Sequence, residues 1–504
     1  MFLAASFRTV RCAGLRLVLI LVMWSLAVAT APLQAQDARP ARAGQVSQFG
    51  VTWTFDREYA VGQFITGDWW VVGPVRIVAI EPACARQEDG RVVNGSMIDP
   101  VIGPDSGFDS AKRYKAELNV ALNVSADRPL VVRPGSSLLS AISNADGKKD
   151  ERVLDTIAVL TVMDKVPPAD AFRPPYVAGA KRLHRFSDVD TAKLPRLKVV
   201  GEPPSWEAVN KLVVRPFIDV APNWNRYHMT PKQNGAPYGR DTSKQMGQVS
   251  LMLMADFPIE QKQTALIGII QRGIDLHGIF RYWDTHRGDC PFPWRSDGGH
   301  SSGRKWPIIF AGVMLGDDDM QSIARVAPHH FFHEDGQTVY VTQQHIDLTN
   351  SERWKPPYDG KKGTQPYSQA MLGMPEWVGN LQPERGNACW TGHPYRLGGN
   401  QNAFHGMALA VLAMGLTEQW NHDAFFDYQT RYTAIMDSKP DPFAALLGYE
   451  PVEGSIKEGG WPGWQQHWDR WQYDMWHEHW PTYYRLPSPD DLVRRAAHQN
   501  TPTP

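Results

Sequence analysis

Features that would place the chain in a well-marked functional class are scarce. Its 504 residues include only four Cys, and its 52 basic residues nearly balance 53 acidic ones. A near-neutral chain without a basic stripe is not typical of a nucleic-acid-binding protein. The sequence also has no phosphate-binding loop, no dinucleotide fingerprint, and no Gly-x-Ser-x-Gly elbow where that motif would need to be. These absences argue against the nucleotide-dependent classes and the α/β-hydrolases.

Long apolar runs are absent beyond the N-terminus. Three Arg precede an apolar stretch at residues 17–31, and residues 33–35 form a plausible cleavage site. This layout is typical of a secretory signal peptide, so we expect residues 1–35 to be removed and the protein to be periplasmic or secreted. The alternative is an uncleaved membrane anchor, for which the stretch is short. Without the three Arg the net charge is −4, from 49 basic and 53 acidic residues.

Few cysteines remain after cleavage. Cys84, Cys290 and Cys389 are an odd number, which cannot pair fully. Cys290 and Cys389 each lie about ten residues before a glycine pair, so they hold equivalent places in two similar segments. In an oxidising compartment they could join two loops through a disulfide. Three buried free thiols are the alternative.

Sequence periodicity changes along the chain. Alternating apolar residues and frequent turn signals predict short strands at first, a proline-rich stretch follows, and the remainder has helical spacing. The predicted fold class is multidomain α+β: an N-terminal antiparallel β-sandwich-like domain followed by an (α/α)n helical toroid. The expected divisions are a flexible lead (36–48), a β-rich domain (49–166), a connector (167–205), the toroid (206–490) and a tail (491–504).

Individual elements follow from the same patterns. The predicted strands cover residues 51–55, 69–72, 75–80, 118–124, 130–132 and 157–162. The predicted helices cover residues 242–255, 258–274, 303–315, 368–373, 402–416, 421–437 and 463–478. Residues 331–341, with a Gly-containing turn between apolar residues, predict an inserted β-hairpin.

Two similar segments lie one hundred residues apart. The pairs Gly298-Gly299 and Gly398-Gly399 each deliver polar residues to the start of a nearly all-apolar helix. A helix that is apolar on every side belongs inside the fold. Together with residues 238–241, these loops would bring helix N-termini and Arg side chains to one cleft, which would attract an anionic substrate.

This combination suits β-elimination across a uronic-acid glycosidic bond. The reaction needs a neutralised carboxylate, a base for the C5 proton and an acid for the leaving oxygen, and imidazole or phenol groups can serve. Nineteen Trp, most beyond residue 280, could also stack on sugar rings. The catalytic candidates are His300, His405, Tyr238 and Tyr395. The substrate-binding candidates are Arg240, Arg304, Arg396, Asn400 and Asn402.

Several other readings stay open. His405 could equally be a hydrogen-bonded core histidine, and Asn400 could satisfy a turn or a cap. Hydrolysis would need two carboxylic acids across the bond, for which the chain offers Asp241, Asp284, Asp297, Glu376 and Glu384. A metal site could use His329, His330 and His333, but they lack the helical spacing of a zinc protease. We expect no metal and no cofactor.

The expected architecture and the residues at 238–241, 297–305 and 393–405 resemble the alginate-lyase and heparinase-like polysaccharide lyases. That resemblance implies cleavage of a uronate-containing polysaccharide by β-elimination. From the charge balance and the signal peptide we expect no nucleic-acid partner and no membrane association after signal cleavage. These families often place the β domain after the toroid, whereas here it comes first. The alternatives are a toroidal glycoside hydrolase and a non-catalytic carbohydrate-binding protein.

Overall fold

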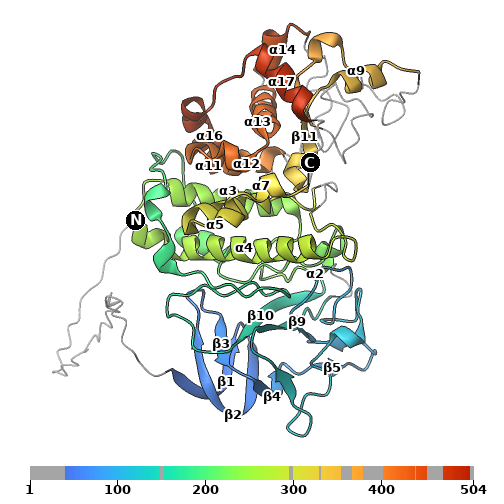
Figure 1. The fold of residues 1–504 in the computed structure, drawn as a ribbon, viewed down its shortest axis with the longest axis vertical. Helices are drawn as coiled ribbons and strands as arrows, with labels where there is room; N and C mark the ends of the chain where they lie inside the picture. Colours follow the sequence, from blue (N-terminus) through green and yellow to red (C-terminus); the bar gives the residue numbers. More distant parts are fainter. Residues whose placement is uncertain are drawn as a thin grey trace, which may run out of the picture. The chain divides into compact units, whose positions relative to one another are not determined.

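The N-terminal half is built on one curved sheet (Figure 1). The computed structural model describes residues 40–147, 152–294, 299–328, 331–352, 366–377, 401–437, 439–450 and 469–499. The strands of this half are β1 (Ala41–Gln48), β2 (Val51–Gln63), β3 (Trp69–Val72), β4 (Val75–Glu81), β5 (Ala85–Arg86), β6 (Val92–Val93), β7 (Ser96–Ile98), β8 (Leu130–Val132), β9 (Ser136–Ser143) and β10 (Leu154–Met163).

The sheet is mixed, and the expected antiparallel β-sandwich is wrong. Its strand order is β7-β9-β10-β3-β2-β4-β8, β1 pairs with β2, and the whole forms a nearly closed barrel. β10 runs parallel to β3, while the other pairs are antiparallel. A parallel pair requires a long crossover, here residues 73–153. Local alternation predicts strands but does not reveal which distant strands will pair.

Strand β10 shows where the core lies. Its residues alternate between two faces, as the period of a strand requires. Ala158, Leu160 and Val162 pack inside the barrel with Trp53. Ile157 and Val159 belong instead to a second buried cluster that contains the central helices. One face of β10 therefore belongs to the barrel core, and the other face belongs to a second core that the sheet shares with the helices.

Three local strand expectations fail. Residues 41–48, expected within a flexible lead, form β1 and pair with β2. Residues 118–124 form no strand, because a 3-10 helix (η1, Ala116–Leu118) and turns occupy this region. β9 was not predicted, since Ser136, Ser137 and Ser140 interrupt its apolar pattern.

Helices make up most of the remaining described chain. They are α1 (Trp206–Lys211), α2 (Asn225–Met229), α3 (Gly239–Met254), α4 (Ile259–Thr285), α5 (Lys305–Leu315), α6 (Asp318–Gln321), α7 (Ile323–Val326), α8 (His333–Gln337), α9 (Gln343–Thr349), α11 (His405–Ala413), α12 (Thr417–Trp420), α13 (Asp423–Met436), α14 (Pro442–Leu447), α16 (Arg470–Tyr483) and α17 (Pro489–Gln499). Short 3-10 helices are η2 (Phe186–Asp188), η3 (Thr191–Lys193), η4 (Gln369–Met371) and η7 (Gln401–Ala403). None of the helices in the described ranges combines the length and apolarity needed to cross a bilayer.

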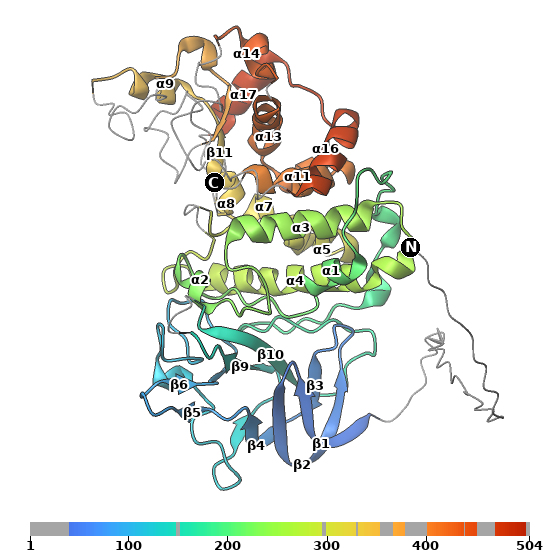
Figure 2. The same ribbon diagram turned by 180° about the vertical axis from the view of Figure 1, so that it is seen from behind.

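The helices stack in layers, so the expected toroid is also wrong. α4 packs against α1, α3 and α5, and α3 packs against α11 on its other side. α11 in turn contacts α13 and α16 (Figures 1 and 2). The pattern of apolar helices predicts burial correctly, since every residue of α5 is buried. It does not distinguish a helix inside a ring from a helix inside a stack, because both are surrounded by apolar neighbours.

The predicted hairpin at residues 331–341 is wrong. His333–Gln337 form α8, and β11 (Thr338–Tyr340) pairs with the distant β12 (Pro375–Trp377). The Gly-containing segment therefore continues as a helical turn into one strand, whose partner lies 35 residues further on in the chain.

Candidate functional site

Two of the three predicted loops meet at the start of α3. The backbone nitrogen of Arg240 donates to the carbonyl oxygen of Gly299 at 3.0 Å. Gly239 makes this approach possible, because a Cβ there would lie 2.5 Å from both the Gly299 oxygen and the Ser302 nitrogen. The 299–304 loop and the N-terminus of α3 therefore form one backbone junction.

This junction carries a group of aromatic side chains. His300 makes edge-on contacts with Tyr238 at a 4.7 Å ring-centroid distance and with Trp224 at 4.5 Å. Trp224 also stacks on Tyr227 at 5.1 Å and 2°. The Arg240 guanidinium lies 5.0 Å from the Tyr238 ring centroid. These five residues are called the aromatic site below.

The aromatic site has one open surface. Trp224 is 46% exposed, which is unusual for a residue that contacts a nearly buried histidine. His300 is 9% exposed, and the Arg240 side chain, 16% exposed, pairs with Asp241 at 3.2 Å. An exposed indole beside an imidazole, a phenol and a guanidinium could stack on a sugar ring and present acid–base groups to it.

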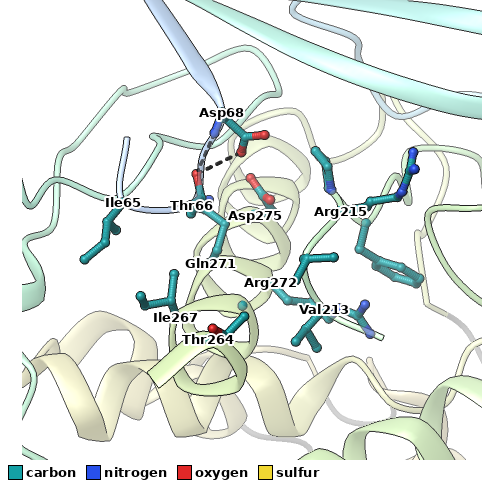
Figure 3. A pocket seen from close by; sticks show the side chains of 14 residues that line it. Ile65, Thr66, Asp68, Val213, Arg215, Thr264, Ile267, Gln271, Arg272 and Asp275 are labelled. Carbon is teal, nitrogen blue, oxygen red and sulfur yellow. Dashed lines mark hydrogen bonds between the residues drawn. The ribbon is translucent and has the colours of Figure 1, made fainter. Parts of the chain in front are cut away.

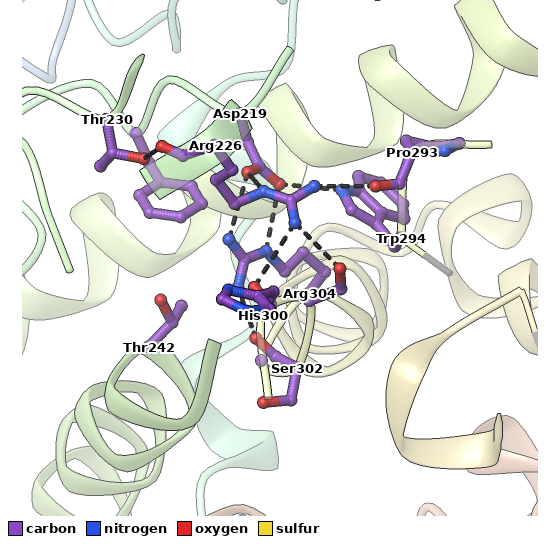
Figure 4. A network of polar contacts seen from close by, with 12 residues as sticks. Asp219, Arg226, Thr230, Thr242, Pro293, Trp294, His300, Ser302 and Arg304 are labelled. Carbon is purple, nitrogen blue, oxygen red and sulfur yellow. Dashed lines mark hydrogen bonds and ion pairs between the residues drawn. The ribbon is translucent and has the colours of Figure 1, made fainter. Parts of the chain in front are cut away.

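A buried ionic network lies next to His300 (Figure 4). Asp219, 1% exposed, accepts hydrogen bonds from Arg226, from Arg304 Nε at 3.0 Å and from Trp294 Nε1 at 2.8 Å. Burial would raise the pKa of Asp219, but the charges of Arg226 and Arg304 hold it below its ordinary value. The carboxylate therefore stays ionised and anchors both guanidinium groups.

The same network fixes the loop that carries His300. Arg226 Nη1 donates to Ser301 Oγ at 2.9 Å and to the His300 carbonyl oxygen at 3.4 Å. On another side of this loop, the Glu334 carboxylate accepts from the Gly303 nitrogen at 2.5 Å. Burial raises the pKa of Glu334 to about 7. The loop is thus held by one ionised network and by one carboxyl group that titrates near neutral pH.

Arg304, expected at a substrate carboxylate, lies inside this network. It has no exposed surface, and besides Asp219 it donates to the Ser302 carbonyl oxygen at 2.5 Å. Residues 299–303 match Gly-x-Ser-x-Gly in letters, but Ser301 is 1% exposed and bonded to Arg226. The arginine positions the loop, and Ser301 is not presented as a nucleophile.

His405 lies in a different environment from His300. It is buried at the start of α11, where its Nε2 lies 2.9 Å from Thr433 Oγ1 and its ring lies 4.9 Å from Trp476. Burial lowers the pKa of His405 to about 3. Asn402, 4% exposed, is also buried, and its carbonyl oxygen lies 3.4 Å from His405 Nδ1. None of these neighbours belongs to the aromatic site.

Part of the predicted set lies outside the described residues. This applies to the site candidates Tyr395, Arg396 and Asn400, to the acids Asp297 and Glu384, and to Cys389, His329 and His330. The described acids form separate ion pairs: Asp241 with Arg240, Asp284 with Arg287, and Glu376 with Arg431.

The remaining histidine of the metal hypothesis is buried. His333 is fully enclosed, and burial lowers its pKa to about 3. Within the described ranges, no group of three or more His, Cys, Asp or Glu side chains is placed to hold a metal ion.

A small cavity between the sheet and α4 is too small for a polysaccharide (Figure 3). Its volume is about 100 Å³, and Asp68, Arg272 and Asp275 line it. Arg173 bridges Asp68 at 2.7 Å and Asp275 at 2.6 Å. Burial raises the pKa of Asp275 to about 6 despite the Arg173 charge. The cavity marks an ionic link between the sheet and α4.

Sequence reasoning missed Asp219, Trp224 and Tyr227. Asp219 lies in an irregular segment, but the run Trp224-Asn225-Arg226-Tyr227-His228 was a visible signal. Its mixture of aromatic and basic residues in a short helix resembles the polar loops that were selected. Comparison with known proteins adds no relative, because no family model, curated protein or solved structure matches the chain.

Proposed function

We propose that this protein is a secreted or periplasmic enzyme that cleaves a uronate-containing polysaccharide by β-elimination at the aromatic site. The observation that carries the proposal is the contact between His300 and Tyr238, at 4.7 Å, beside the exposed Trp224. Two segments about sixty residues apart in the chain bring a base, an acid and a stacking surface together. The export part of the proposal rests on the N-terminal sequence alone.

Each residue has a role in the proposed reaction. Arg240 pairs with the sugar carboxylate and makes the C5 proton more acidic, replacing part of its contact with Asp241. His300 accepts the C5 proton as the C5–H bond breaks. The C4–O4 bond breaks, the C4=C5 double bond forms, and Tyr238 protonates O4 of the departing sugar. Trp224 and Tyr227 hold the ring of a neighbouring sugar by stacking.

The proposal requires a specific product. Purified mature protein incubated with alginate, pectate and glycosaminoglycans should generate ultraviolet absorbance from the unsaturated C4=C5 bond. His300→Ala and Tyr238→Phe should each lower the rate by 10²–10⁴-fold, the usual share of an acid–base group. Tyr282→Phe, away from the aromatic site, is the matched control and should retain wild-type turnover.

A second candidate is a non-catalytic carbohydrate-binding protein. The exposed Trp224, stacked on Tyr227 at 5.1 Å, favours it, because such a platform binds sugars without any chemistry. Glycan binding that depends on Trp224, with no product from any polymer, would select this candidate. New reducing ends without the absorbance would instead indicate hydrolysis and contradict elimination.

A further inference from the structure

A larger pocket lies between the connector and the C-terminal half of α4. Its volume is about 630 Å³, within the range of about 300–1,000 Å³ that is usual for small-molecule sites. None of its lining residues belongs to the aromatic site. The pocket is lined by side chains from the connector, from α4 and from the turn after α5, among them Pro175, Val177, His184, His277, Tyr282 and Asp317.

The charges around this pocket are already balanced. Arg182 pairs with Asp317 at 2.7 Å, and Arg281 lies 3.9 Å from Asp284. Asp319 also lines the pocket. Arg182 therefore faces a lining carboxylate, and Arg281 has the carboxylate of Asp284, outside the lining, beside it. An anionic ligand would have to compete with these carboxylates for the lining arginines. A cationic ligand would be repelled by the same arginines.

Two of the three histidines that line the pocket, His184 and His277, are neutral at neutral pH. Burial lowers the pKa of His277 to about 4, although Asp317 and Asp319 act in the opposite direction. Burial also lowers the pKa of His184, against the nearby Asp317. A neutral imidazole offers one donor and one acceptor nitrogen. Ligand groups that both donate and accept hydrogen bonds suit such a pair.

The rest of the wall is apolar or aromatic. Pro175, Val177 and Ile274 contribute aliphatic surface. Tyr282 and His286 stack at 4.2 Å and 16°, which adds a rigid aromatic wall. The pocket thus combines aliphatic and aromatic surface with carboxylates and neutral imidazoles.

We propose that this pocket binds a neutral saccharide of one or two rings. Sugar hydroxyl groups both donate and accept, so they match His184, His277 and the lining carboxylates. The C–H faces of a pyranose ring match the aliphatic and aromatic wall. A cavity of about 630 Å³ has room for a disaccharide. The site is independent of elimination chemistry at the aromatic site and would let the protein hold a neutral sugar beside an acidic polymer.

The experiment uses the mature full chain and measures binding directly. Maltose, cellobiose, a uronate disaccharide and adenosine are tested by saturation-transfer NMR and calorimetry. We expect millimolar binding of at least one neutral disaccharide. Ala180→Trp, which fills the pocket from an exposed position, should weaken that binding at least tenfold. Ala208→Trp, at an exposed position of α1, should leave it unchanged.

Each other outcome overturns the proposal. Absence of binding for both neutral disaccharides, equal binding in Ala180→Trp, or a preference for the uronate disaccharide or adenosine would do so. His277→Phe is a second variant, which removes the ring nitrogens while keeping a planar ring, and it should also weaken binding. Trp224→Ala should leave neutral-sugar binding intact, so failure of the proposed lyase activity would not be confused with failure of this site.

Discussion

Glu334 provides a direct test of how the His300 loop is held. Its side chain is fully buried, and one carboxyl oxygen accepts from the Gly303 nitrogen at 2.5 Å. Within the described residues, the other oxygen has no hydrogen-bond partner. Glu334→Gln keeps an acceptor for Gly303 and removes the ionisable group. The two proteins should therefore differ in the pH dependence of stability more than in structure.

The size of the effect follows from the pKa of Glu334. Burial raises it from an ordinary 4.5 to about 7 in the folded chain. Between these values the folded state holds a proton that the unfolded state has lost. The contribution of Glu334 to stability is therefore greatest below pH 4.5 and is lost as the pH rises to about 7. The total loss is about 3 kcal/mol, at about 1.4 kcal/mol per pH unit.

Urea denaturation of the two proteins at pH 5 and pH 8 measures this difference. Wild type should lose about 2.5 kcal/mol relative to Glu334→Gln between these conditions, and the variant should be the more stable protein at pH 8. Glu88→Gln, at an exposed position, is the control and should follow wild type. Parallel stability profiles for wild type and Glu334→Gln would refute the reasoning, because they would mean that Glu334 is ionised at pH 5 in the folded state.

Two further variants probe the scaffold of the aromatic site. Asp219→Asn removes the charge that faces two buried guanidinium groups, so we expect a loss of about 3–5 kcal/mol by urea denaturation. The exposed ion-pair variant Asp284→Asn should cost less than about 1 kcal/mol, and an equal effect of both would contradict the network. Gly239→Ala places a Cβ 2.5 Å from the Gly299 oxygen and should cost about 1–3 kcal/mol and lower turnover. Gly103→Ala, where a Cβ meets open space, should be neutral in both measurements.

Local patterns predicted the elements better than their arrangement. The strands at residues 69–72 and 130–132 are confirmed, and the buried helix predicted at 303–315 is found at Lys305–Leu315. Alternating apolar residues and helical spacing reflect how one strand or helix buries one of its faces, so they can be recognised from a single segment of sequence. The parallel pairing of β3 with β10 depends on residues about ninety positions apart, which no local pattern records. The sandwich and toroid expectations failed at this step.

The candidate site shows the same limit. The structure brings Tyr238, Arg240 and His300 together, residues that the sequence placed next to glycines at the starts of buried helices. The same pattern selected Arg304 as a ligand-binding residue, because the sequence does not show whether an arginine at a helix start binds a ligand or a buried acid. Only the tertiary structure shows that Asp219 accepts a hydrogen bond from Arg304. The buried counter-ion Asp219 therefore gives Arg304, which appeared to be a substrate-binding residue, a structural role instead.

The two histidines that the sequence offered as catalytic candidates, His300 and His405, should give opposite phenotypes. His405 is enclosed, bonded to Thr433 at 2.9 Å, and has a pKa lowered by burial to about 3. Between pH 6.5 and 3 the unfolded state binds a proton that the folded state excludes, so this group lowers stability as the pH falls through that window. His405→Gln should therefore flatten the acid side of the stability profile and, because it perturbs a packed core, lower stability at pH 7. Its turnover per folded molecule should remain near wild type.

His300→Gln should affect turnover more than stability, because His300 contacts the exposed Trp224 and is not enclosed in a core as His405 is. Stability should change less than in His405→Gln, while turnover on uronate polymers should be lost. Circular dichroism at graded urea concentrations, together with the absorbance assay, separates the two effects. If His405→Gln abolishes turnover in fully folded protein while His300→Gln does not, the catalytic centre lies beside α11 and the assignment to the aromatic site is wrong.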